Sequence, residues 1–194
     1  LRARSGARSA PRRRRGSAGA RPRVPRVGGG AGGRGALARL AGGGPRPVAP
    51  AGRLPAGGIL ARDRRAVIVL LDGQEAEWSK LLCARFGRSI GAAAERIRFA
   101  PRRSGTDYLR LLMAADVVLD TPHFCGGLSS YEAFACAKAL ITLPSPFLRG
   151  RLTLGLYRQM GLDIGVARNG DDYVRRAVEL AETPLRRAEV ERTI

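Results

Sequence analysis

The chain has 194 residues, enough for one ordinary domain, and carries 35 Lys and Arg against 16 Asp and Glu, a formal net charge of +19. Its longest uninterrupted apolar run, residues 66–71, is far shorter than the roughly 20 residues that a membrane-spanning helix needs. Cys83, Cys125 and Cys136 show no Cys-x-x-Cys spacing, so the sequence indicates neither a disulfide framework nor a zinc site, and we predict no metal. We interpret the three cysteines as reduced, buried thiols. The sequence shows no secretory signal, so we predict a cytoplasmic protein without a membrane partner.

The first quarter of the chain differs from the rest in composition. Residues 1–54 hold 14 arginines, no lysine and no acidic residue, with 13 of the 26 glycines and 6 of the 12 prolines. Such a segment buries too little apolar surface to offset the entropy of ordering it, so we predict a disordered basic low-complexity segment, with at most a helical patch near residues 36–41. Three interpretations stay open: a nucleic-acid-binding arm, an organelle transit peptide, or an out-of-frame or misassigned start. We favour the third, and the segment has no aromatic residue on which a base would stack.

From residue 55 the charge falls to 21 basic and 16 acidic residues, a net of +5, and strand and helix patterns alternate. Short apolar runs predict strands at 66–71, 96–100, 116–120 and 140–143. Helical spacing predicts helices at 75–88, 106–115, 130–137, 149–160, 171–182 and 185–192. Ser104 or Thr106 is the expected cap of the second helix. Strands separated by helices pair in parallel, so we predict an α/β fold with a Rossmann-like open parallel sheet over residues 55–194.

The loop after the third predicted strand, residues 120–132, combines two glycines with the start of a helix. Gly126 and Gly127 let the backbone approach a ligand, and a helix N-terminus offers N–H groups and a positive dipole end, which suits a diphosphate. Ser129-x-x-Glu132 also fits a capping box, which we favour on the spacing alone although the two interpretations are not exclusive. Both interpretations stay open, and Glu132 can also accept hydroxyl groups of a ribose.

Other polar residues near the predicted strand ends have two interpretations each. Asp120 is either catalytic or, beside Thr121-Pro122, a turn-initiating carboxylate, which we favour. His123, the only histidine, is expected to be a loop residue rather than a base. Arg102 and Arg103 follow the second strand and either meet a phosphate or lie in solvent, while Tyr108 is either a core-edge residue or a stacking face for a base.

The order of motifs in residues 96–188 resembles a known family. The stretches RIRFAPRRSGTDYLRLLMAADVVLDT, GGLSSYEAFA, ITLPSPFLRGRLTLGLYRQMGL and DDYVRRAVELAETPLRR resemble the C-terminal half of the catalytic region of bacterial, tetratricopeptide-linked O-GlcNAc transferase-like glycosyltransferases. The weaker ILARDRRAVIVLLDGQ extends the resemblance back to residue 59. It implies that residues 55–194 are the nucleotide-sugar-binding half of a GT-B glycosyltransferase.

The resemblance also implies an activity, the transfer of GlcNAc from UDP-GlcNAc to Ser or Thr hydroxyls of an acceptor protein. The family uses no metal, because a helix N-terminus and a cation stabilise the leaving diphosphate. In the family, a backbone group holds the uracil and an aromatic side chain packs on it, and the resemblance matches these to Arg103 and Tyr108. A helix start binds the diphosphate, matched to Gly127, Leu128 and Ser129, and an acidic residue binds the ribose, matched to Glu132.

The chain also departs from the family pattern. Gly127 and Leu128 stand where the family has a hydroxyl or histidine pair, and the family's lysine falls at Pro47, beside Arg46. A guanidinium replaces an ammonium poorly. The N-terminal GT-B domain is not recognisable, so we expect a fragment with the UDP-binding half only and no measurable transfer, and we assign no catalytic residue. The alternative is a non-catalytic protein that binds nucleic acid through residues 1–54, or a scaffold, on a degenerate glycosyltransferase domain.

Overall fold

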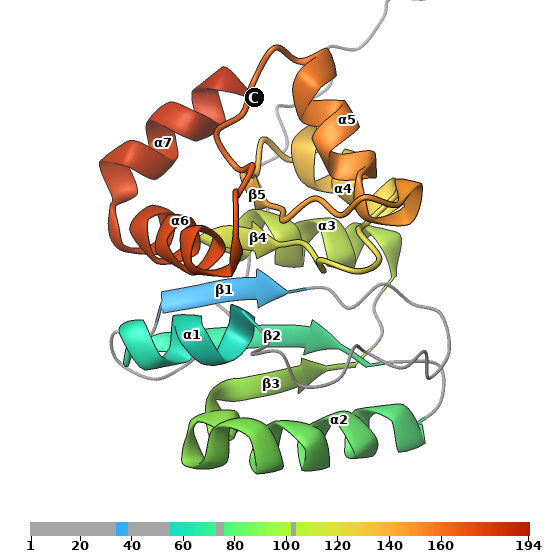
Figure 1. The fold of residues 1–194 in the computed structure, drawn as a ribbon, viewed down its shortest axis with the longest axis vertical. Coiled ribbons are helices and arrows are strands. Elements are labelled where there is room, and N and C mark those ends of the chain that lie inside the picture. The colour runs from blue at the N-terminus through green and yellow to red at the C-terminus, as the bar shows by residue number, and fades with distance from the viewer. Residues whose placement is uncertain (1–33, 39–54, 73–75, 102–103) are drawn as a thin grey trace, which may run out of the picture.

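The computed structural model describes residues 34–38, 55–72, 76–101 and 104–194. Within them one parallel sheet has the strand order β3-β2-β1-β4-β5, as Figure 1 shows. The strands are β1 (Arg34–Ala38), β2 (Ala66–Leu71), β3 (Ile97–Ala100), β4 (Val117–Leu119) and β5 (Leu140–Ile141). The chain runs from β1 outward to β3, then places β4 on the other side of β1. Parallel sheets bind ligands beyond the carboxyl ends of the strands at such a reversal of order.

The central strand β1 is the main difference from the sequence prediction. Residues 34–38 were expected to be disordered or part of a helical patch, but they pair in parallel with β2 on one side and β4 on the other. The segment Arg-Gly-Ala-Leu-Ala contains no β-branched residue, so its own propensity gives little sign of a strand, and its two neighbours place it. Residues 1–33 and 39–54 lie outside the described residues. The predicted boundary between the basic segment of residues 1–54 and the domain of residues 55–194 therefore stays a prediction.

Six of the seven α-helices in the described residues follow the predicted order, and the first, Pro55–Arg62, was not predicted. The helices are α1 (Pro55–Arg62), α2 (Ala76–Ile90), α3 (Gly105–Ala114), α4 (Leu128–Ala135), α5 (Leu152–Gln159), α6 (Gly170–Glu182) and α7 (Pro184–Thr193), with 3-10 turns η1 (Gly91–Arg96) and η2 (Leu148–Gly150). Ser104 caps α3 as predicted, because its side chain accepts the N–H of Asp107. The six predicted helices and four predicted strands are all present, with ends shifted by a few residues.

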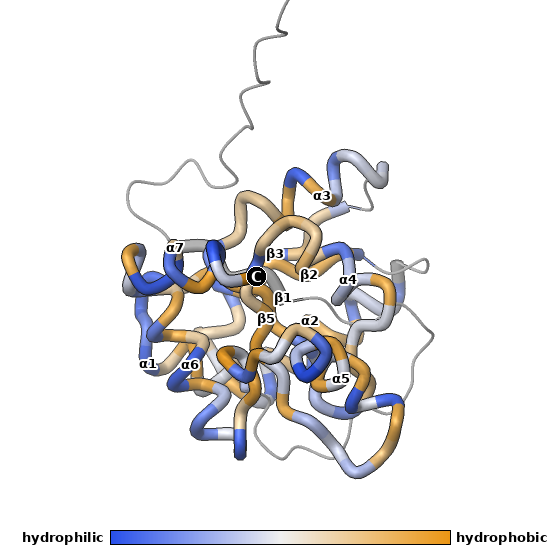
Figure 2. Tube along the Cα trace, turned by 90° about the horizontal axis from the view of Figure 1, so that it is seen from above, coloured by the Kyte–Doolittle hydropathy of each residue, from blue (hydrophilic) through white to orange (hydrophobic). Residues whose placement is uncertain are grey.

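The sheet is apolar on both faces, which explains the continuous apolar runs in the sequence. Along β2, Ile68 and Leu70 join one buried cluster, which includes residues of α1, α2, α6 and α7. Val69 between them joins a second cluster, with residues of α3, α4 and α5. Figure 2 shows the hydrophobic strands in the middle of the molecule, with hydrophilic residues on the helices around them. This two-sided burial is typical of parallel sheets.

The outer edge of β5 is closed by a buried side chain and a loop. The hydroxyl of Tyr157 on α5 donates to the carbonyl oxygen of Leu140 at 2.8 Å and accepts the Leu140 N–H at 3.1 Å. Burial raises the pKa of this phenol well above its ordinary value. Next along the strand, the N–H of Thr142 donates to the carbonyl of Gly165, and Ala167 donates back to Thr142. These bonds satisfy backbone groups that an open edge would leave unpaired.

We predict that Gly165→Ala destabilises the fold by about 1–3 kcal/mol. A Cβ at Gly165 would overlap the carbonyl oxygen of Leu140 and the ring of Tyr157. These two groups are hydrogen-bonded to each other, so neither can move away alone. Gly155→Ala in α5 is the matched control, since a Cβ there meets nothing within 4 Å, and it should stabilise the helix by about 0.5–1 kcal/mol. Urea unfolding of both variants measures the difference. Equal free energies of unfolding would contradict the packing described for β5.

Candidate functional site

The loop between β4 and α4 lies at the reversal of strand order and is held by the buried carboxylate of Asp120. Oδ1 of Asp120 accepts the N–H of Gly126 at 2.8 Å and that of Thr121 at 3.0 Å. Oδ2 accepts the hydroxyl of Thr142, which follows β5, at 2.8 Å. The hydroxyl of Tyr173 on α6 donates to the carbonyl oxygen of Asp120. Asp120 therefore joins the loop to β5 and α6, a role that neither sequence interpretation of this residue described.

A second buried contact holds the start of α4 against α5. The hydroxyl of Ser130 donates to the carbonyl of Gly126 and lies 2.9 Å from the hydroxyl of Thr153. Ser130 and Thr153 are both buried, as are Asp120 and Thr142. These four polar side chains lie directly beneath the loop, where each has a hydrogen-bond partner. Satisfied buried networks of this kind fix a single geometry.

The capping box predicted at Ser129 is wrong. Helix α4 begins at Leu128 with Gly127 as its N-cap, and no side chain makes a cap hydrogen bond there. Ser129 is thus inside the first turn and cannot act as the cap. Among the described residues, no acceptor takes the N–H groups of Gly127, Leu128 or Ser129. An uncapped helix start of this kind presents free donors and the positive end of the helix dipole to a ligand.

Tyr108 of α3 lies next to this helix start. It lines a small hollow together with Gly126, Ser129 and Ser130, closed below by residues 118–120 and Leu140. The free volume of the hollow is about 10 Å³, about the room for one water. A nucleotide is far larger than that, so it would lie across the mouth of the hollow and not inside it. Tyr108 is 8% exposed and packs in the core, which agrees with a core-edge position.

The remaining sequence-predicted residues are distributed around the same loop. Leu128 is the first residue of α4 and its side chain is exposed, and Glu132 is half-buried one turn further along the helix. His123 is an exposed loop residue, as predicted. Arg102 and Arg103 lie outside the described residues, as do Arg46 and Pro47. The structure thus brings Tyr108 and the start of α4 together and leaves the roles of the six matched residues as predictions.

The cysteines bear out the sequence interpretation only in part. All three are free, but Cys83 is exposed, Cys136 is half-buried and only Cys125 is buried. The described part of the chain brings no three His, Cys, Asp or Glu side chains together as a metal site would require. No helix in that part is long and apolar enough to cross a bilayer.

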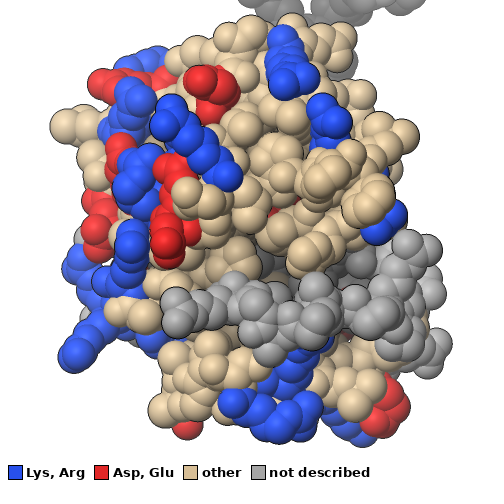
Figure 3. All heavy atoms as spheres, in the orientation of Figure 1, with Lys and Arg blue, Asp and Glu red and all other residues tan. Residues whose placement is uncertain are grey.

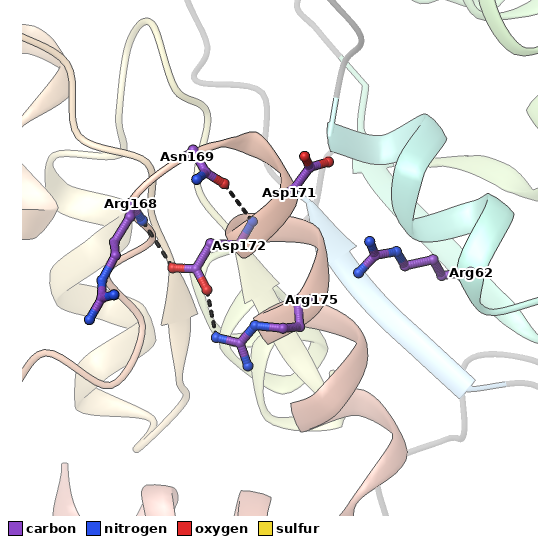
Figure 4. Close-up of a pocket in the computed structure, with 6 residues that line it drawn as sticks. All are labelled: Arg62, Arg168, Asn169, Asp171, Asp172 and Arg175. Atoms are coloured by element: carbon purple, nitrogen blue, oxygen red, sulfur yellow. Dashed lines mark hydrogen bonds and ion pairs between the residues drawn. The ribbon is translucent and has the colours of Figure 1, made fainter.

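A second hollow lies between α1 and the start of α6, on charged residues that the sequence analysis did not single out. Asp172 lies at its centre, where it accepts the N–H of Arg168 and pairs with Arg175, while Asn169 caps the helix through the N–H of Asp172, as Figure 4 shows. The Arg168 N–H and the ion pairs lower the pKa of Asp172 well below its ordinary value. Arg62 of α1 reaches toward it. Ion pairs and a satisfied cap account for most of this cluster, which indicates a structural role.

Comparison with known proteins extends the fold assignment. No protein-family model and no curated protein sequence matches the chain. Among solved structures, it is similar to a mutant O-GlcNAc transferase from Thermobaculum terrenum, with a TM-score of 0.64 and 27% identity over 72% of this chain and 27% of that one. Alr3699/HepE from Anabaena, solved with UDP and glucose, has a TM-score of 0.57 and 16% identity over 80% of this chain and 41% of that one.

A further similar structure is WaaG, a glycosyltransferase involved in lipopolysaccharide biosynthesis, with a TM-score of 0.57 and 13% identity over 82% of this chain and 41% of that one. The chain therefore spans between about a quarter and two fifths of the proteins that it matches. The fold is that of the Rossmann-like, nucleotide-sugar-binding half of GT-B glycosyltransferases.

We predict that Asp120→Asn makes stability less dependent on pH. Burial raises the pKa of the Asp120 carboxyl above its ordinary value, and the hydrogen bonds from Gly126, Thr142 and Thr121 offset this only in part. Between the ordinary and the raised pKa, the folded state keeps a proton that the unfolded chain has lost, so the free energy of unfolding falls as pH rises through that window. The asparagine variant lacks this loss, and its amide can still accept from Gly126.

Urea titrations from pH 4 to pH 8 measure the effect. The stability difference between Asp120→Asn and the unaltered protein should move in favour of the variant as pH rises. Asp171→Asn, at an exposed position in the first turn of α6, is the matched control. A difference that is constant over the whole range would show that Asp120 does not keep its proton to higher pH in the folded state.

Proposed function

We propose that the chain binds the diphosphate of a nucleotide sugar at the start of α4 and is the donor-binding part of a glycosyltransferase. The observation that carries this is the set of N–H groups of Gly127, Leu128 and Ser129, which have no acceptor within the described residues at an uncapped helix start. They lie at the reversal of strand order, where parallel sheets bind nucleotides. Anions are favoured at such a helix end by both its donors and its dipole.

The comparisons support the same ligand class. The similar protein from Anabaena was solved with UDP and glucose. The O-GlcNAc transferase shares 27% identity over 72% of this chain. Together with the motifs of residues 96–188, this favours UDP-GlcNAc as the donor and a Ser or Thr hydroxyl of a protein as the acceptor.

The proposed chemistry is electrostatic. When the bond from the sugar to the diphosphate breaks, negative charge grows on the leaving diphosphate, and fixed N–H donors stabilise that charge more than they stabilise the bound donor. The proposal therefore needs no metal at this position. The backbone at Arg103 would hold the uracil, and the base would contact the exposed part of Tyr108. Glu132, one turn into α4, would accept the ribose hydroxyls.

We predict that Gly127→Asp keeps the fold and weakens UDP binding. A Cβ at Gly127 meets only a methyl group of Leu152, at 3.8 Å, so the position has room for a side chain. Aspartate is a good N-cap, so its carboxylate should take the free N–H groups of the helix and repel the diphosphate. We expect weak UDP binding by the unaltered protein and a loss of at least about tenfold in the variant, about 1.4 kcal/mol.

Isothermal titration with UDP measures the affinity, and thermal unfolding shows that the variant still folds. Gly127→Ala is the matched control, since it adds the same Cβ without a competing acceptor and should bind UDP as the unaltered protein does. A Gly127→Asp variant that folds and binds UDP with unchanged affinity would refute the site. Titrations with EDTA and with Mg²⁺ test the metal-free part, and identical heats are expected for both.

A further inference from the structure

Exposed apolar side chains gather beside the start of α4. Of the nine large apolar residues that are exposed in the described part of the chain, six come from residues 124–152. We call them the apolar rim: Phe124, Leu128, Tyr131, Phe147, Leu148 and Leu152. Leu128, Phe147 and Leu148 protrude most, with 74%, 60% and 76% of their surface exposed. Scattered exposed apolar residues need no explanation, but a contiguous group marks an interaction surface.

Backbone contacts bring the two segments that carry the rim together. The N–H of Cys125 donates to the carbonyl of Arg149 at 2.8 Å, and the N–H of Leu152 donates to the sulfur of Cys125 at 3.2 Å. A methyl group of Leu152 also lies beside Gly127. The loop before α4 and the turn before α5 are therefore packed against each other, and their apolar side chains lie on neighbouring segments.

The rim carries positive charge. Arg149 lies over the ring of Phe147, 4.6 Å from its centre, and Arg151 is exposed close by in the sequence. No carboxylate in the described part of the chain forms an ion pair with either arginine. Residues 121–162 contain a single acidic residue, Glu132. Figure 3 shows basic side chains among uncharged ones at the upper right, over α5, whereas acidic side chains gather on the left over α6 and α7.

These features distinguish between possible occupants. A second copy of the chain in a two-fold arrangement would bring Arg149 and Arg151 of both copies together, which like-charge repulsion disfavours. A bound peptide occupies a groove or extends an open sheet edge. The outer edge of β5 is already closed, and Leu128, Phe147 and Leu148 stand out from the surface. Protruding apolar side chains flanked by arginines match the interface of an anionic lipid bilayer, where apolar groups enter the acyl boundary and cations meet the headgroup phosphates.

We propose that the apolar rim is a peripheral docking surface for an anionic lipid bilayer. Phe147 and Leu148, which lie outside the proposed diphosphate site, enter the bilayer surface, and Arg149 and Arg151 contact lipid phosphates. The sequence predicted no membrane partner because that prediction rests on spanning and signal segments, whereas peripheral contact depends on which apolar residues the fold exposes. The contact needs no nucleotide, so it goes beyond the proposed function and is tested apart from it.

The test places a tryptophan in the rim. Leu148→Trp is mixed with vesicles of phosphatidylcholine and phosphatidylserine, with and without brominated acyl chains, which quench an inserted indole. Leu185→Trp is the matched control, because Leu185 is 80% exposed on α7. The unaltered protein, with Trp78 alone, supplies the background. We expect quenching of Leu148→Trp that exceeds that of the control by at least about twofold and disappears in vesicles of phosphatidylcholine alone.

A second measurement removes the insertion. In vesicle sedimentation at one fixed, physiological salt concentration, the arginines of residues 1–54 attract both variants equally. Leu148→Asp should lose most of its bound fraction, and Leu185→Asp, which adds the same charge, should lose none. Equal quenching of the two tryptophan variants, or none in either, would overturn the proposal and leave only attraction through basic residues or a protein partner. Self-association in sedimentation velocity that Leu148→Asp abolishes would also overturn it, in favour of a second copy.

Discussion

The geometry of the candidate site depends on one buried carboxylate. Asp120 follows β4 and accepts the N–H of Gly126, so it determines where the loop ends and α4 begins. Its second oxygen accepts the hydroxyl of Thr142, and its carbonyl accepts that of Tyr173. One residue thus connects the loop to the end of β5 and to α6. Burial raises the pKa of this carboxyl, and the hydrogen bonds to its two oxygens offset only part of the cost of ionising it.

Much of the fold could be predicted from the sequence because the parallel sheet is buried on both faces. The apolar run of β2 and the shorter runs of β3, β4 and β5 stand out in the sequence for this reason. Strand β1 could not be predicted, since Arg34–Ala38 contains a single large apolar residue within a segment of arginine, glycine and proline. Its position follows from pairing with β2 and β4, which is a property of the assembled sheet.

The location of the site could be predicted from the sequence, but its geometry could not. The glycines and the helix start after β4 were visible in the sequence, but the capping box at Ser129 was a wrong prediction because the helix begins at Leu128. Thr142 and Thr153 gave no signal, since a threonine in a strand or a helix is common and its burial depends on distant elements. The same holds for Leu148, whose exposure follows from the turn that η2 makes before α5.

The loop satisfies its buried polar groups, whereas the N–H groups of Gly127, Leu128 and Ser129 at its end have no acceptor among the residues that the structure describes. Beneath it, Asp120 holds Gly126, and Ser130 lies against Thr153. At its surface, glycine at position 127 supplies no side-chain acceptor for the helix N–H groups. Glycine at an N-cap is only a few tenths of a kcal/mol worse than serine or aspartate, so free donors cost the fold little. Because the network beneath is rigid, these donors keep fixed directions, and an anion that binds them meets groups that need no reorganisation.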